Sequence, residues 1–238
     1  MYNSLTRNFF LLSFFSFFIG SCHLNSDQLN NKSPHNNNSH KDITRQIKSS
    51  EIYKKKSKVD LLLEETKNNF KKKTLPLFSN RFPNNNIEQT KLSLDRKTPG
   101  IEGGSYPGNI DITIETLKLE PLFLKFAIFH EMGHIVTIPQ KNLYNLGPLL
   151  NGEKYNDYQK SEFLADLIAT HLMSNQDHVN LINKKNSLEK LLGPGDAMHP
   201  SGRERVNVIM NYLASTKNER KTIKEKKFKK LFSDLWNK

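Results

Sequence analysis

Apolar residues recur at helical spacing along much of the chain, and this pattern predicts a mostly helical protein. Strongly apolar helices are predicted over residues 122–138 and 162–173, and a third helix over residues 203–213. A basic amphipathic helix is predicted over residues 216–238, with an apolar stripe made of Phe228, Leu231, Phe232, Leu235 and Trp236. This stripe can pack on the rest of the domain or lie on an anionic membrane surface. We favour packing, because a small domain gains from the added apolar burial.

One short segment alternates with a period of two instead. Ile110, Ile112 and Ile114 alternate with polar residues, which is the signature of a half-buried strand. The predicted fold class is therefore α+β: a compact, mostly helical domain over residues 87–215, with a small sheet in which residues 110–114 form an edge strand.

The first residues are typical of an export signal. Arg7 precedes an apolar run from Phe9 to Ile19, which is interrupted only by two serines. Eleven helical residues span about 16 Å, whereas the hydrocarbon core of a bilayer is about 30 Å thick. The run therefore predicts a signal peptide over residues 1–21 rather than a membrane-spanning helix.

An aliphatic residue and two small residues precede Cys22, the only cysteine of the chain. This resembles a bacterial lipobox, which implies cleavage before Cys22 and lipidation of its side chain. An ordinary signal peptide with a cysteine nearby is the alternative. Residues 22–42 are polar and rich in asparagine, so they predict a flexible tether. We expect a lipoprotein anchored to a membrane of the bacterial cell envelope, on its extracytoplasmic side.

Composition narrows the choice of partners and cofactors. Residues 43–86 are basic and are predicted to form a helix followed by a loop. Lys and Arg outnumber Asp and Glu by 36 to 24, which gives a net charge of +12. The lysine-rich stretches form no recognisable nucleic-acid-binding module, so no nucleic-acid partner is predicted. A single cysteine excludes an intrachain disulfide and a zinc site built from cysteines.

The sequence His130-Glu131-Met132-Gly133-His134 matches the HExxH pattern inside the first predicted helix. Residues four apart project from the same face of a helix, so both imidazoles can reach one metal ion. Glu131 lies beside the first histidine and can act as the base that activates water. The flanking residues are apolar, as a buried active-site helix requires.

A third metal ligand is predicted in the second helix. Catalytic zinc usually takes three protein ligands, and Glu162 would complete the set. Asp166 lies four residues after Glu162, so both can face the metal helix, and it could accept the free N–H of a ligating imidazole. Ala165, between them, is small enough to let the two helices approach closely.

The segment from His199 to Arg205 precedes and begins the third helix. Pro200 and Ser201 are typical of a turn followed by a helix cap. Alternatively, His199 and Arg205 lie at the cleft and donate to the oxyanion of a tetrahedral intermediate. The spacing of these residues does not decide between the two interpretations.

In this order, HExxH, ExxAD and HPxxxxR resemble the motifs of the M48 family of gluzincin metallopeptidases, which contains the CAAX prenyl proteases. The resemblance covers about residues 100–212. It implies a zincin-like fold with one zinc ion, held by His130, His134 and Glu162. It also implies a role for each remaining match: Glu131 as general base and acid, Asp166 as support for a ligand, and His199 with Arg205 near the substrate carbonyl.

The activity implied by this resemblance is the hydrolysis of peptide bonds in envelope proteins. In such sites an extended protein or peptide substrate adds to an edge strand through main-chain hydrogen bonds. We expect Ile110, Ile112 and Ile114 to form that strand.

Two features depart from the family. The interval from His134 to Glu162 is short, and the membrane-spanning helices of the prenyl proteases are missing from the apolar pattern. The short interval is also similar to the ImmA/IrrE metallopeptidases, which cleave repressors in the cytoplasm. The export signal and the segment from His199 to Arg205 argue against that family. A non-catalytic lipoprotein scaffold with a vestigial zincin fold is a third interpretation.

Overall fold

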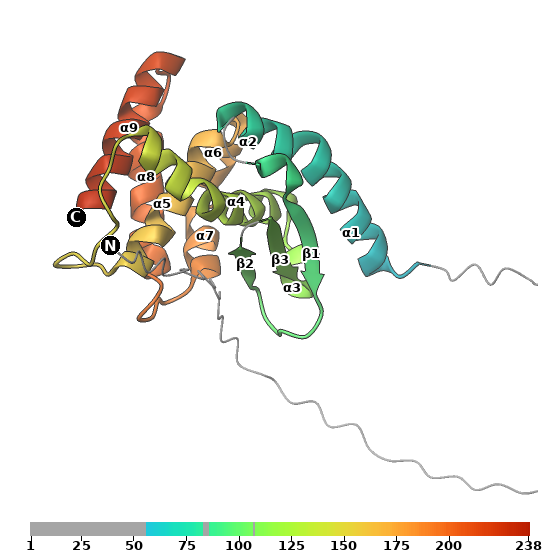
Figure 1. The fold of residues 1–238 in the computed structure, drawn as a ribbon. Helices are drawn as coiled ribbons and strands as arrows, with labels where there is room; N and C mark the ends of the chain where they lie inside the picture. Colours follow the sequence, from blue (N-terminus) through green and yellow to red (C-terminus); the bar gives the residue numbers. More distant parts are fainter. Residues whose placement is uncertain (1–55, 83–85, 107) are drawn as a thin grey trace, which may run out of the picture.

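The computed structural model describes residues 56–82, 86–106 and 108–238 (Figure 1). The signal peptide expected over residues 1–21, Cys22 and the tether expected over residues 22–42 lie outside these ranges. Within them, no helix is both long enough and apolar enough to cross a membrane. The elements follow in this order: α1 (Lys58–Asn69), a π-helix (Phe70–Thr74), α2 (Leu75–Arg81), a 3₁₀ turn (Ile87–Gln89), β1 (Lys91–Asp95), β2 (Gly103–Tyr106), β3 (Asn109–Thr113), α3 (Ile114–Leu117), α4 (Pro121–Leu143), α5 (Asp157–Leu172), α6 (Asn175–Asn183), α7 (Lys185–Leu192), α8 (Gly202–Thr216) and α9 (Lys221–Asn237).

Helix α4 lies between the sheet and a layer of helices (Figure 1). It contacts β2 on one side and α5 on the other, and α5 in turn packs on α8 and α9. The side chains of α4 that face these neighbours are apolar, including Phe126, Phe129, Met132 and Val136, all of which are buried. The described part of the chain is therefore α+β, mostly helical with a three-stranded sheet, as the hydrophobic pattern predicted.

The strand predicted over residues 110–114 is present, but it is not an edge strand. Among the described strands the order is β1–β3–β2, so β3 lies in the middle, parallel to β1 and antiparallel to β2. Ile110 and Ile112 are buried in the core, and Ile114 is already the first residue of α3. Alternation identifies a strand with one buried face, but it carries no information about which strands flank it. The strand beside α4 with a free edge is β2.

The first two helices belong to the compact domain, so the boundary expected at residue 87 is wrong. Phe70, Leu75, Phe78 and Phe82 are buried in the same hydrophobic core as the helices that follow. The ring of Phe78 meets that of Phe129 on α4 edge to face, with the ring centres 5.4 Å apart. The apolar face of this segment is not apparent from its sequence, because many lysines occupy the exposed positions between the buried phenylalanines.

Side-chain caps fix where α5 and α8 begin. Asn156 accepts a hydrogen bond from the backbone N–H of Gln159 at 2.8 Å, which starts α5. Ser201 caps α8 in the same way, and Glu204 completes a capping box. The cap predicted at Ser201 is thus confirmed. Such caps set the phase of a helix, and hence which side chains face its neighbour.

The apolar stripe of α9 is buried, which confirms packing rather than an exposed membrane-binding face. Phe228, Phe232, Leu235 and Trp236 all lie in the core, and the ring of Phe232 contacts Tyr144 at 5.6 Å between ring centres. The indole N–H of Trp236 donates to the carbonyl of Gly147, 3.1 Å away. Helix α9 thereby holds the loop that connects α4 to α5.

Replacing Phe232 by Ala should lower the free energy of unfolding of the full chain by about 3–5 kcal/mol, because a fully buried ring is lost. Urea denaturation followed by circular dichroism measures this change. Lys226→Ala, at an exposed position of the same helix, is the matched control and should stay within about 0.5 kcal/mol of the parent. Equal stability of the two variants would contradict the packing of α9.

Candidate metal centre

Three side chains from α4 and α5 converge on one point. His130 and His134, one turn apart on α4, place their Nε2 atoms 3.0 Å from each other. Glu162 on α5 reaches both: its Oε2 lies 3.3 Å from Nε2 of His130, and its Oε1 lies 3.2 Å from Nε2 of His134. Within the described ranges, this is the one group of His, Cys, Asp and Glu side chains placed to hold a metal ion, with its ligand atoms within 4.8 Å of one another.

The helices can bring these ligands together because they meet at two small residues. A Cβ atom added to Gly133 would lie 2.8 Å from the carbonyl oxygen of Ala165 and 2.9 Å from its Cα. Any larger residue at position 133 would therefore push α5 away from α4. The close approach expected from Ala165 is present, and Gly133, inside the HExxH sequence, is the other half of it.

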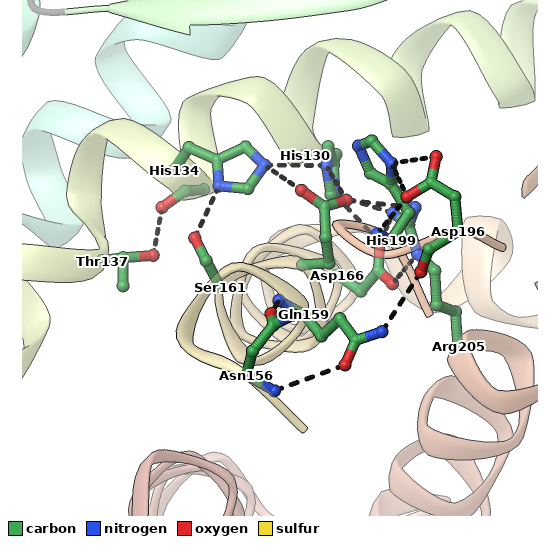
Figure 2. A network of polar contacts seen from close by, with 12 residues as sticks. His130, His134, Thr137, Asn156, Gln159, Ser161, Asp166, Asp196, His199 and Arg205 are labelled. Atoms are coloured by element: carbon green, nitrogen blue, oxygen red, sulfur yellow. Dashed lines mark hydrogen bonds and ion pairs between the residues drawn. The ribbon is translucent and has the colours of Figure 1, made fainter. Parts of the chain in front are cut away.

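Each histidine is held through its second nitrogen (Figure 2). Nδ1 of His130 lies 2.9 Å from Oδ1 of Asp166, and Nδ1 of His134 lies 3.1 Å from Oγ of Ser161. An ionised carboxylate only accepts hydrogen bonds, so Nδ1 of His130 carries a proton and Nε2 is the nitrogen that can bind a metal ion. The predicted role of Asp166 thus agrees with the geometry. Ser161 was not predicted: adjacent residues of a helix point about 100° apart, so its place before Glu162 did not indicate that it reaches His134.

The donor set fits a metal cation. Two imidazole lone pairs and a carboxylate face one another at about 3 Å, an arrangement that is repulsive unless a positive charge lies between them. In the metal-free chain a proton serves this purpose. Burial lowers the pKa of His130, but the negative charges of Glu162 and Asp166 outweigh burial and raise it to about 9. A divalent ion would replace that proton and bind all three ligands.

Glu131 lies beside the ligands but is held differently. It is buried, and burial raises the pKa of its carboxyl, an effect that the neighbouring His130 and His134 oppose. The hydroxyl of Ser105 on β2 hydrogen-bonds to this carboxylate, whose Oε2 has no hydrogen-bond partner among the described residues. Gly103 on the same strand leaves room for this carboxylate, because a Cβ there would lie 2.7 Å from Oε1 of Glu131 and would displace it.

Arg205 is not at the cleft, so its predicted role as an oxyanion donor is wrong. Its guanidinium is fully buried and binds both oxygens of Asp166, at 2.7 Å through Nε and 2.8 Å through Nη2. Its Nη1 lies 3.1 Å from Oε2 of Glu162. Burial raises the pKa of each carboxyl, but Arg205 opposes it, and the pKa of Glu162 lies well below its ordinary value. Arg205 keeps both carboxylates ionised and in place.

His199 is fixed by the turn that carries it. Its Nδ1 lies 3.0 Å from both carboxylate oxygens of Asp196, which also accepts the backbone N–H of His199 at 2.8 Å. Gln159 on α5 donates to the carbonyl of Asp196, so the turn is attached to the helix that carries Glu162. Figure 2 shows His199 and Asp196 on the Arg205 side of the cluster, away from His134. Asp196 was not among the predicted site residues, although it lies only three positions before His199.

These contacts form a largely buried group of two histidines and one glutamate that could hold a metal ion. Comparisons with protein-family models, with curated proteins and with solved structures found no match for this chain. The function proposed below therefore rests on the arrangement of the side chains of this chain alone.

Replacing Gly133 by Ala should weaken metal binding and lower the free energy of unfolding by about 1–3 kcal/mol, because the new methyl group collides with Ala165. The higher helix propensity of alanine offsets part of this loss. Competition with a chelator measures the affinity. Gly147→Ala is the control, since a Cβ there meets no atom within 4 Å. An unchanged affinity in Gly133→Ala would show that helix spacing does not set the ligand geometry.

Replacing Arg205 by Met should lower the free energy of unfolding of the metal-free chain by about 3–5 kcal/mol, because it leaves two buried carboxylates without their cation. Urea denaturation in the presence of a chelator tests this. Arg203→Met, an exposed arginine one half-turn earlier on α8, supplies the comparison and should change little. A stable Arg205→Met chain would mean that the guanidinium serves another purpose.

Proposed function

We propose that this protein is a zinc-dependent endopeptidase with a zincin-like domain of the M48-like gluzincin type. The observation that supports it best is the combination of the ligand set with a buried base: His130, His134 and Glu162 converge, and Glu131 lies directly beside them. A set of two histidines and one carboxylate that leaves an open position is typical of catalytic zinc. When bound there, zinc supplies Lewis-acid polarisation of the scissile carbonyl.

The residues of the chain itself supply the proton transfers. Glu131 takes a proton from the attacking water and passes it to the leaving amine. Burial raises its pKa, which makes the carboxylate a stronger base than an exposed glutamate. Its Oε2, without a partner among the described residues, is the atom available for this task. The hydrogen bond from Ser105 holds the Glu131 carboxylate against β2 and so keeps it in position during both proton transfers.

An extended substrate would bind along β2 rather than along the strand first expected. Among the described strands β2 is the free edge beside Glu131, and its main-chain groups can pair with a peptide as an added strand. Gly103 and Gly104 carry no side chains that would keep the substrate away from the centre. His199, oriented by Asp196, is the remaining candidate to stabilise the oxyanion.

We also propose that the enzyme acts in the bacterial cell envelope. The support is the apolar run before Cys22 and the polar tether after it, which together fit a lipid-anchored protein on the extracytoplasmic side. The substrates would then be envelope proteins or peptides. A lipid anchor on a tether would hold the catalytic domain near the membrane without burying it.

Glu131→Gln should retain zinc but lower the turnover of an unfolded protein substrate by about 10²–10⁴-fold, because it removes the base and leaves the ligands in place. His134→Ala should instead lose the metal, which elemental analysis of the purified chain detects. Glu120→Gln, at the exposed start of α4, is the control for both. Undiminished proteolysis by Glu131→Gln, or full zinc content in His134→Ala, would contradict the proposal.

A further inference from the structure

A narrow cavity of about 30 Å³ lies directly beside His130 and Glu131. Apolar side chains from four parts of the chain form most of its walls: Ile101, Leu119, Phe126, Ala127, Leu191 and Leu192. We refer to this cavity as the pocket. Leu191 and Leu192 come from the end of α7, an element that plays no part in the metal centre.

Two polar groups at the walls, the hydroxyl of Thr116 and the carbonyl of Glu102, are already engaged. The hydroxyl of Thr116 donates to the carbonyl of Glu102 at 2.7 Å. The backbone N–H of Thr113 also donates to that carbonyl, at 3.1 Å. The side chain of Glu102 lies at the border with a neighbouring groove that contains Asp95. An apolar ligand group therefore fits this pocket, whereas a hydroxyl or amide placed in it would find few partners.

The wall formed by α7 cannot easily move outward. Its last turn packs on the start of α8, where a Cβ added to Gly202 would collide with the carbonyl of Glu189. The backbone N–H of Gly202 also donates to the carbonyl of Gly193 at 2.7 Å. The volume of about 30 Å³ is roughly that of two water molecules measured the same way, so a branched or aromatic side chain of leucine size or larger exceeds it.

We propose that this pocket receives the substrate side chain next to the scissile bond, and that Leu192 limits it to short apolar residues such as alanine and valine. The proposal rests on the endopeptidase function and specifies its substrate class. Glu131 and His130, the proposed base and a candidate metal ligand, both line the cavity, so a substrate side chain that fills it would lie close to the reacting carbonyl. A peptide with a bulky residue at that position could not seat its main chain against Glu131.

The test uses the zinc-loaded full chain and dipeptide hydroxamates that differ only in the side chain beside the hydroxamate: alanine, valine, leucine or phenylalanine. Calorimetry should give dissociation constants at least about tenfold lower for the alanine and valine probes than for the other two. Leu192→Ala should remove this difference by enlarging the pocket. Leu188→Ala removes the same atoms one turn earlier on α7, outside the pocket, and should keep it.

A second variant distinguishes a change in the pocket from a loss of stability in Leu192→Ala. Ala127→Leu fills the pocket from α4 without removing a core side chain, and should weaken the alanine and valine probes by about tenfold or more. Three results would each overturn the proposed role of the pocket. They are equal affinity of the unmodified chain for all four probes, the absence of any binding, and identical behaviour of Leu192→Ala and Leu188→Ala.

Cleavage of a peptide library by the same preparations separates this proposal from the proposed function. Probes bound in the expected order without cleavage of any peptide would support the pocket and overturn the endopeptidase. Peptides cleaved by the unmodified chain with no preference for alanine or valine on either side of the broken bond would overturn the pocket and leave the endopeptidase in place.

Discussion

The metal centre depends on how closely α4 and α5 approach each other. The ligands come from both helices, so the spacing between the two backbones sets the distances among the histidine nitrogens and the glutamate oxygens. Gly133 and Ala165 make that spacing as small as backbone contact allows. Because Gly133 lies between the two histidines in sequence, the residue that permits the contact and the residues that use it belong to the same turn of helix.

Buried charge is the second constraint. Glu162 and Asp166 are ionised in an environment with little water, which would be unfavourable without a compensating cation. Arg205 provides that cation from α8 and hydrogen-bonds to the carboxylates with a rigid, planar group. This use of its guanidinium leaves Arg205 buried beneath the centre, where it supports the ligands and has no surface to offer a substrate.

Two elements outside α4 supply the walls of the proposed cleft. Strand β2 lies so close to Glu131 that a side chain at position 103 would displace the carboxylate. The end of α7 closes the small apolar cavity beside His130. The short loop between α4 and α5, held by α9 through Trp236, adds no helix of its own over the described centre. In the proposed enzyme, substrate selection would therefore rest on β2 and α7.

The sequence by itself determined the α+β class, helices α4, α5, α8 and α9, and which side chains share a helix face, because these follow from spacing within one element: His134 is four residues after His130, and Asp166 is four residues after Glu162. It could not determine contacts between distant segments. Only the tertiary structure decided that β2 rather than β3 is the free edge, that Phe78 joins the core, and that Arg205 is buried. Neighbours in a sheet and partners of a long side chain depend on how elements pack in space, and a local periodicity carries no record of that packing.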